Sequence, residues 1–377
     1  MKTKITVTLL IILMCCTGCL RGEMNIIDEL AIIIAMGFET FPEEDPDKVT
    51  ITTINPLFGE RAEDQTRLMS VSGFGLAGAM DNWQRFRNRE MAIGKVQLIV
   101  FGENLTNQGI IEKTQDLRQI PDIEVRSDVV YFPGDPKDIL ALKPPEEQRI
   151  GTYITDNLRI MDQEGFSPQV TLHDLWTNIL TEGRDPFMPM VEIEENENTP
   201  YFSGMALLDE NGKLATILDF AESKLLYMLL ARHSNPTMTT KINGGEELGE
   251  GLVIFKISSS EKEIKTNLNN EELEITIVNN IKMSIEEIEV RGAEVLTEES
   301  FEIFSDEIAA DLTLAITALI EKLQNANTDP LGLGHFVRIQ QTEYYHQGTW
   351  REDYPNIDIK VETNIETIRG TTFERTY

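Results

Sequence analysis

The chain has 377 residues, with 33 Lys and Arg against 64 Asp and Glu, so its formal net charge is −31. This acidity excludes non-specific binding to nucleic acid, which requires a basic surface. Hydrophobic residues make up 41% of the chain, which is typical of a globular protein and excludes general disorder. The length predicts two or three domains.

The N-terminus has the pattern of a bacterial lipoprotein signal peptide. Two lysines precede an apolar run that is too short to span a membrane, and small residues precede Cys19. We expect a signal peptide at 1–18, cleavage after Gly18, and attachment of an S-diacylglycerol and an N-acyl (palmitate) group to Cys19. The alternative is an ordinary secretion signal with Cys19 incidental. In either case the mature chain could form no intrachain disulfide and no multi-thiolate zinc site.

From Leu30 to Leu180 the chain alternates between strand-like and helix-like segments, which predicts an N-terminal α/β domain at 19–192. The helix after Gly75 places Trp83 and Phe86 on one apolar stripe, so we expect both in the core. Buried strands are predicted at 30–37, 49–54, 96–101 and 128–132, and further helices at 110–117, 135–142, 153–161 and 172–180.

Turn residues and dense charge at 181–200 predict a domain boundary. Asn211-Gly212 then favours a hairpin with a type I′ turn, and a helix follows it. These pieces form an expected small middle domain at 200–240. The expected strands are 202–208 and 213–218, and the expected helix is 219–231.

The remaining chain, 241–377, is expected to be a C-terminal α+β domain. Its predicted strands alternate between apolar and polar residues, and its long helix carries a continuous apolar stripe. The chain as a whole is therefore predicted to be a multi-domain α+β protein. The C-terminal strands are expected at 253–257, 273–277, 281–285 and 357–361, the long helix at 297–324, and loops at Pro236 and Gly244-Gly245.

No catalytic motif occurs in the sequence, so we expect no enzyme activity and no cofactor. Asp209 to Gly212 resembles the start of a calcium loop but lacks the distal glutamate. No two histidines stand four residues apart, so no metal site is expected. In the segment Asp329 to Gly334, two glycines within three residues predict a structural corner with a positive φ.

Several short motifs, taken in order, resemble one known family. The mature chain is similar to the Ger(x)C spore germination lipoproteins, the C subunits of nutrient germinant receptors. In place of the Trp-Asp that many members have after the lipid cysteine, this chain has Leu20-Arg21, so the resemblance implies no shared role for those two side chains. The motifs are 27–32, Thr53-Ile54-Asn55-Pro56, Ser72-Gly73-Phe74-Gly75 with 94–100 after it, Gly204-Met205-Ala206-Leu207-Leu208 and Asp329-Pro330-Leu331-Gly332-Leu333-Gly334.

The resemblance implies three mixed α/β domains and no enzyme activity. It also implies a place on the outer face of the spore inner membrane and assembly with two multipass subunits, A and B. We therefore expect a receptor subunit that is anchored through Cys19, is needed for germination, and binds no nucleic acid and no small molecule. The main alternative is a solute-binding lipoprotein of a transporter, which would normally show two lobes around a cleft. A lipid-anchored hydrolase is a third alternative, which the missing motifs disfavour.

Overall fold

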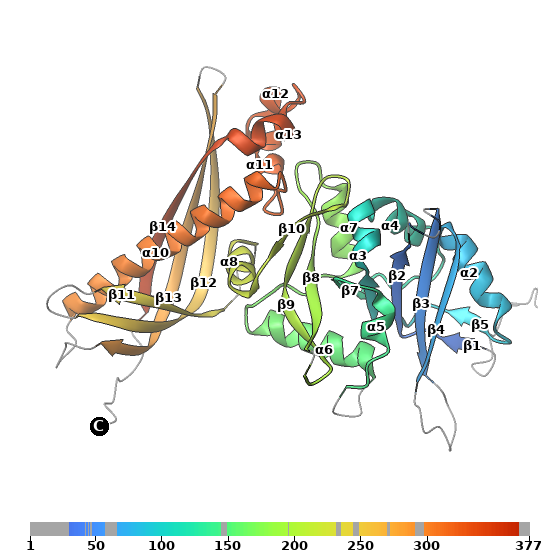
Figure 1. Ribbon diagram of the computed structural model, residues 1–377. Helices are drawn as coiled ribbons and strands as arrows, with labels where there is room; N and C mark the ends of the chain where they lie inside the picture. The colour runs from blue at the N-terminus through green and yellow to red at the C-terminus, as the bar shows by residue number, and fades with distance from the viewer. Residues whose placement is uncertain are drawn as a thin grey trace, which may run out of the picture.

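The computed structural model describes residues 30–368, apart from 42, 44, 46, 57–65, 145–148, 195, 231–234, 244–248, 270–271 and 291–297. Gly18, Cys19 and the expected signal peptide lie outside the described residues. The fold is α+β, as predicted. The molecule is elongated, with a large sheet covered by helices at one end and a smaller sheet crossed by one long helix at the other (Figure 1).

The large sheet is mixed, and its central strands are buried along their whole length. Leu98 and Val100 pack with helices α5 (Pro136–Leu140) and α6 (Ile150–Gln163) on one face, whereas Ile99 and Phe101 belong to the core on the other face. Because helices cover both faces, consecutive residues of one strand are all apolar. The strand order is β10 (Leu214–Leu218), β9 (Thr199–Leu208), β8 (Phe187–Glu194), β7 (Asp128–Tyr131), β6 (Leu98–Phe101), β2 (Ala35–Thr40), β3 (Lys48–Pro56), β4 (Thr66–Phe74).

Six helices accompany this sheet, and their starts follow local capping rules. The Asp135 side chain accepts a hydrogen bond from the Lys137 amide, and Pro136 occupies the first helical position, as the sequence predicted. Thr171 and Asp174 form a capping box at the start of α7. The helices are α2 (Gly75–Arg85), α3 (Glu103–Gln108), α4 (Ile111–Arg118), α5 (Pro136–Leu140), α6 (Ile150–Gln163) and α7 (Leu172–Leu180).

The predicted strand 30–37 is divided between two sheets. β1 (Leu30–Ile32) pairs in parallel with β5 (Glu90–Ala92), and β2 begins only at Ala35. The Ile33 amide donates to the Ala92 carbonyl, while the Ile34 amide donates to the Ile54 carbonyl. The chain thus passes from one sheet to the next at these two residues.

Phe86 is not a core residue, contrary to the prediction, whereas Trp83 is buried as expected. α2 ends at Arg85, and Phe86 follows it as the C-cap, with its amide donating to the Trp83 carbonyl. Its side chain is 70% exposed. The buried stripe therefore ends at Trp83, because the helix stops one residue before Phe86.

The expected boundary segment 181–200 contains β8, which the sequence analysis did not predict. β8 pairs antiparallel with β9 and meets β7 at Met190 opposite Tyr131, so one sheet continues across this segment. The hairpin of β9 and β10 is confirmed, but its turn is not type I′. Only Gly212 of the turn has a positive φ, 73°, and the Asp209 amide donates to the Lys213 carbonyl. The division into domains at 19–192, 200–240 and 241–377 stays a prediction.

The small sheet has the order β11 (Thr237–Asn243), β12 (Glu250–Asn269), β13 (Glu272–Val290), β14 (Asp358–Ile368). The two strands predicted at 273–277 and 281–285 are one continuous strand, β13, because Asn279 and Asn280 continue the ladder with β12. Asn279 is buried there and accepts a hydrogen bond from Ser260 at 2.7 Å. β11 occupies a segment that was expected to be a loop.

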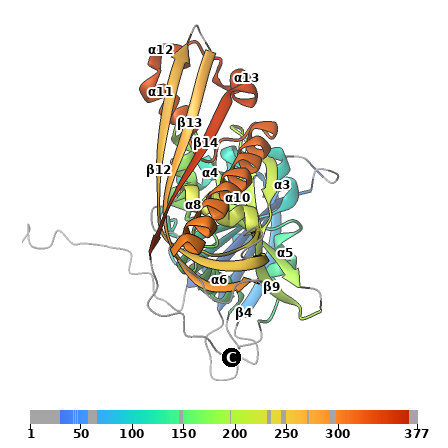
Figure 2. The same cartoon turned by 90° about the vertical axis from the view of Figure 1, so that its left-hand side faces the viewer.

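The predicted long helix is confirmed as α10 (Glu298–Asn325). It crosses one face of the small sheet (Figure 2) and buries its stripe, including Phe304, Ile308 and Leu312, against that face. The short helices α11 (Leu333–Gln340), α12 (Thr342–Tyr345) and α13 (Trp350–Asp353), with the 3-10 turn Tyr354–Asn356, then lead into β14. They were not predicted.

Helix α8 (Phe220–Leu230) lies between the two sheets (Figure 1). Its residues 225–229 are all buried, because β9 and β10 pack on one side of it and β12 and α10 on the other. Lys322 of α10 also donates to both oxygens of Glu222, at 2.8 and 2.6 Å. The two ends of the molecule are therefore joined by a packed junction, which contains the candidate site.

Candidate functional site

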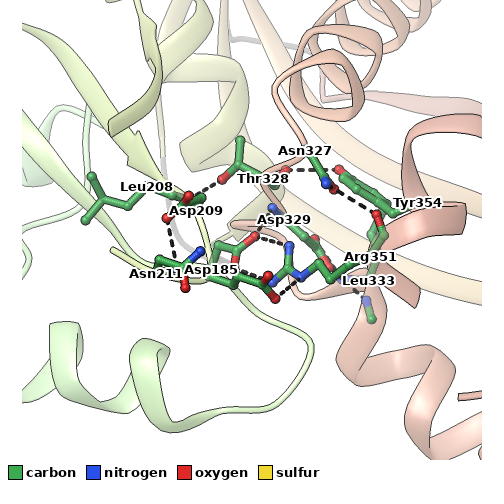
Figure 3. A network of polar contacts seen from close by, with 12 residues as sticks. Asp185, Leu208, Asp209, Asn211, Asn327, Thr328, Asp329, Leu333, Arg351 and Tyr354 are labelled. Atoms are coloured by element: carbon green, nitrogen blue, oxygen red, sulfur yellow. Dashed lines mark hydrogen bonds and ion pairs between the residues drawn. The ribbon is translucent and has the colours of Figure 1, made fainter. Parts of the chain in front are cut away.

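The segment after α10 returns to the large sheet and bonds to it through buried groups (Figure 3). The Thr328 hydroxyl donates to the Leu208 carbonyl at 2.6 Å. The Asp185 amide donates to the Asp329 carbonyl at 2.9 Å, and the Asp329 amide donates to Asp185 Oδ2 at 2.7 Å. Since Asp185, Thr328 and Asp329 are fully buried, these bonds form away from water and fix the position of this segment.

The Asp329 carboxylate holds the start of α11. Its Oδ1 accepts from the Leu333 amide at 2.9 Å and its Oδ2 from the Gly334 amide at 2.8 Å. Burial raises the pKa of Asp329 to about 6, while these two amides oppose that rise and the charge of Asp185 adds to it. A carboxylate at a helix N-terminus satisfies amides that have no partner within the helix.

Arg351 of α13 closes the junction (Figure 3). Its guanidinium donates to both carboxylate oxygens of Asp185, with 2.6 Å from Nη1 to Oδ2, and its Nε lies 3.2 Å from Glu210 Oε2. Asn327 donates to the Arg351 carbonyl at 3.2 Å. The two-bond pair with Asp185 and the contact with Glu210 together join three distant chain segments in one geometry.

Glycines allow the segments to approach this closely. Gly332 has a φ of 70°, which confirms the predicted corner with a positive φ. A Cβ on Gly332 would lie 2.7 Å from Arg184 Nε, and a Cβ on Gly334 would lie 2.5 Å from Trp350 Nε1. A Cβ on Gly183 would meet the Gly334 carbonyl carbon at 2.4 Å. The backbone at these glycines therefore fills the space that a side chain would need.

A cleft of about 310 Å³ lies beside the junction and is lined by residues from both ends of the molecule, including Thr181, Glu182, Glu210 and Tyr345. Two of its lining side chains, Arg184 and Trp350, each have a buried nitrogen atom, Nε and Nε1, without a hydrogen-bond partner among the described residues. The cleft is therefore lined both by hydrogen-bond donors and by the acids Glu182, Asp185 and Glu210.

The described residues contain no group of three or more His, Cys, Asp and Glu that could hold a metal ion. Within the same residues, no helix is both long enough and apolar enough to cross a membrane.

The sequence analysis singled out Asp329 to Gly334 but missed the partners of Asp329. Asp185 lies 144 residues from Asp329 and 166 from Arg351, and no local pattern links them. The one available signal was an aspartate between Arg184 and Pro186, directly before a strand. Cys19 and Gly18, the other predicted site residues, lie outside the described part of the chain.

One further motif glycine has a clear packing role. A Cβ on Gly204 of β9 would lie 2.0 Å from the Leu218 carbonyl oxygen, so β9 and the end of β10 approach each other only because this residue has no side chain.

Comparison with curated proteins gives no significant match. Among solved structures, the crystal structure of the GerBC protein resembles this fold with a TM-score of 0.54 and 16% identity, over 88% of this chain and 96% of that one. Two family models match the sequence: the spore germination protein N-terminal domain at residues 23–193, and the spore germination B3/GerAC-like C-terminal domain at residues 203–371. The chain therefore belongs to the Ger(x)C family of spore germination proteins.

Proposed function

We propose that this protein is a non-enzymatic, lipid-anchored subunit of a spore germinant receptor. It is needed for the germination response to nutrients and acts by assembly with the multipass A and B subunits. The observation that carries the proposal is the match of both family models, which together extend over most of the chain. No cofactor, metal or nucleic acid takes part in this proposed role.

The proposed anchor is Cys19, cleaved from Gly18 and carrying an S-diacylglycerol and an N-acyl group, on the outer face of the spore inner membrane. Support comes from the pattern of residues 1–19. Two or more acyl chains suffice for stable anchoring, because each buried CH₂ contributes about 0.8 kcal/mol.

The junction supports a structural role in this proposal. Its buried acids already have partners: Asp185 pairs with Arg351, and Asp329 holds the amides of α11. These contacts set the orientation of the small sheet relative to the large one. A subunit that works by assembly needs such a fixed arrangement to present surfaces at both ends to its partners.

The direct test of the anchor is membrane fractionation of spores that express Cys19→Ala. We expect this variant to leave the membrane fraction, and the mature N-terminal peptide of the wild type to carry the mass of the lipid. Cys15→Ala is the matched control, because it removes a cysteine from the part that is cleaved away. Full membrane retention of Cys19→Ala would refute the anchor.

Assembly is tested by capturing the protein from detergent-solubilised spore membranes and identifying the polytopic proteins that accompany it. Deletion of the gene is expected to abolish the response to at least one nutrient. Normal germination of the deletion strain on every nutrient tested would contradict the proposed function.

The cleft is the observation that favours the alternative, a solute-binding lipoprotein, because donors line a concave space between two parts of the chain. Calorimetry of the mature chain with Cys19→Ala against amino acids, sugars and nucleosides separates the two functions. We expect no heat of specific binding for any of these compounds. A stoichiometric complex with micromolar affinity would favour the alternative.

A further inference from the structure

The end of the molecule nearest the N-terminus carries a basic segment, Arg85-Phe86-Arg87-Asn88-Arg89. It runs from the last residue of α2 to the residue before β5, and β5 pairs in parallel with β1, with Glu90 opposite Leu30. Leu30 is the first described residue and stands eleven positions after Cys19. Figure 1 shows α2, β1 and β5 together at the end of the molecule opposite the small sheet. The segment therefore lies beside the point where the N-terminal tether enters the fold.

This region is basic although the chain as a whole is acidic. The described residues 66–95 contain only two acids, Asp81 and Glu90, and more than twice as many basic residues. None of these basic residues forms an ion pair with another described residue. Those basic residues are Arg67, Arg85, Arg87, Arg89 and Lys95, all exposed except the half-buried Arg87.

Arg87 positions the segment on the fold. Its Nη2 donates to Asn55 Oδ1 at 3.1 Å, and its guanidinium lies 5.2 Å from the centre of the Trp83 ring. Burial and the positive charge of Arg67 both lower the pKa of Arg87. Two like charges thus lie close together, and an external anion would relieve their repulsion.

Phe86 adds an apolar group at the centre of the segment. Its side chain is 70% exposed and is flanked on both sides by arginines. Aromatic side chains next to basic ones are typical of surfaces that rest on lipid, because the ring enters the headgroup boundary while the cations meet the phosphates.

We propose that Arg67, Arg85, Phe86, Arg87 and Arg89 form a basic–aromatic surface that rests on the anionic lipid headgroups of the membrane. The proposal rests on the anchor at Cys19 proposed above. The eleven residues from Cys19 to Leu30 can reach at most about 40 Å, so the tether holds this end of the molecule near the membrane. The surface then sets which side faces the lipid, and the small sheet points away from it.

The net charge of −31 does not prevent this contact. Exposed charges are screened over about 8 Å at physiological ionic strength, so acids at the far end of the molecule have little effect at this surface. Each basic residue near an anionic membrane is attracted to it separately.

The first test uses the native lipidated chain on vesicles. The mature chain has Cys19 as its single cysteine, so Asn88→Cys introduces one free thiol for a fluorescent probe. We expect spin-labelled lipids in phosphatidylglycerol vesicles to quench this probe several-fold more than a probe at Leu314→Cys, an exposed position on α10. The difference should disappear in phosphatidylcholine vesicles. Equal quenching at both positions in phosphatidylglycerol vesicles would overturn the surface while leaving the anchor intact.

The second test removes the anchor. The mature chain with Cys19→Ala is expected to sediment with phosphatidylglycerol vesicles, and a further Arg85→Ala and Arg89→Ala pair should weaken this binding about thirtyfold. The matched control, Lys241→Ala with Lys256→Ala, removes the same charge from exposed positions on the small sheet and should change nothing.

Phe86→Ala should weaken the binding of the Cys19→Ala chain about tenfold, whereas Leu314→Ala, which removes an equally exposed apolar side chain, should not. Absence of vesicle binding by the Cys19→Ala chain would overturn the surface, and so would equal losses in the two double variants. Loss of membrane retention by the native chain would instead refute the anchor.

Discussion

The two sheets of this protein are stabilised in different ways. Helices cover both faces of the large sheet, so β6 buries every residue from Leu98 to Phe101. The small sheet is covered by α10 on one face, so β12 alternates between buried and exposed side chains and β14 between half-buried and exposed ones. The central strands of the large sheet therefore tolerate change on neither face, whereas the small sheet has one face free for solvent or a partner.

Truncation of a side chain should cost very different free energies on the two faces of the small sheet, but similar free energies on the two faces of the large sheet. Phe255→Ala in β12 should lower the free energy of unfolding by about 3–5 kcal/mol, because it empties a core position. Leu252→Ala, at a position that is 39% exposed, should cost less than about 1 kcal/mol.

In β6 the same contrast should be absent. The side chains of Leu98 and Ile99 lie on opposite faces of the sheet. Leu98→Ala and Ile99→Ala should each lower the free energy of unfolding by about 2–5 kcal/mol. Urea denaturation of the four variants measures all of these values. A tolerated change at either Leu98 or Ile99 would show that the large sheet is not packed tightly on both faces.

The second prediction concerns the junction that joins the sheets. Asp185→Ala leaves Arg351 without its buried partner and should lower the free energy of unfolding by about 3–5 kcal/mol. The two ends should then unfold in separate calorimetric transitions.

Lys360→Ala serves as the control, because it breaks an exposed ion pair with Glu274 on the small sheet and should leave the free energy of unfolding nearly unchanged. If Asp185→Ala still unfolds in one transition with unchanged midpoint, the junction does not couple the sheets.

A buried glutamate should make the stability of the large sheet, but not that of the small sheet, depend on pH. Glu39 of β2 is buried and accepts hydrogen bonds from three amides, two of them in the first turn of α3, and burial raises its pKa to about 7 from 4.5. Between these values the folded state keeps a proton that the unfolded state has lost. The contribution of Glu39 to the free energy of unfolding therefore falls by up to about 3 kcal/mol as the pH rises from about 4.5 to 7. Above about pH 7 this contribution stays low.

Glu39→Gln should flatten this part of the profile of unfolding free energy against pH, measured by urea denaturation at each pH. Glu362→Gln, at an exposed position on β14, should leave the profile unchanged. A Glu39→Gln profile parallel to the wild type would show that Glu39 titrates equally in both states.

The smallest expected effect is at the glycine corner. Gly332→Val should cost more than about 1 kcal/mol, because φ is 70° and the new Cβ would meet Arg184 at 2.7 Å. Gly348→Val isolates the backbone contribution, since Gly348 has a φ of 80° but open space around it. Thermal melts that show a greater loss for Gly348→Val would contradict the packing argument. A Gly332→Val protein with native melting temperature and lost signalling would instead mark a functional surface.

Local features of this protein were determined by the sequence alone. The stripe of α10 predicted a helix at 297–324, and the structure has it at Glu298–Asn325. Asp135 and Pro136 predicted a helix start, and Gly332 a positive φ. These features depend on side-chain periodicity and on hydrogen bonds between near neighbours, which are present in any short stretch of the chain.

Which segments meet depends on how the separate elements pack in the folded protein. β8 joins the large sheet through an expected boundary, Phe86 is exposed because α2 stops at Arg85, and Asp185 pairs with Arg351 across 166 residues. Such contacts arise when separate elements pack and bury each other's polar groups. Their energies depend on partners that are remote in sequence, so the periodicity and capping signals of a single segment could not specify them.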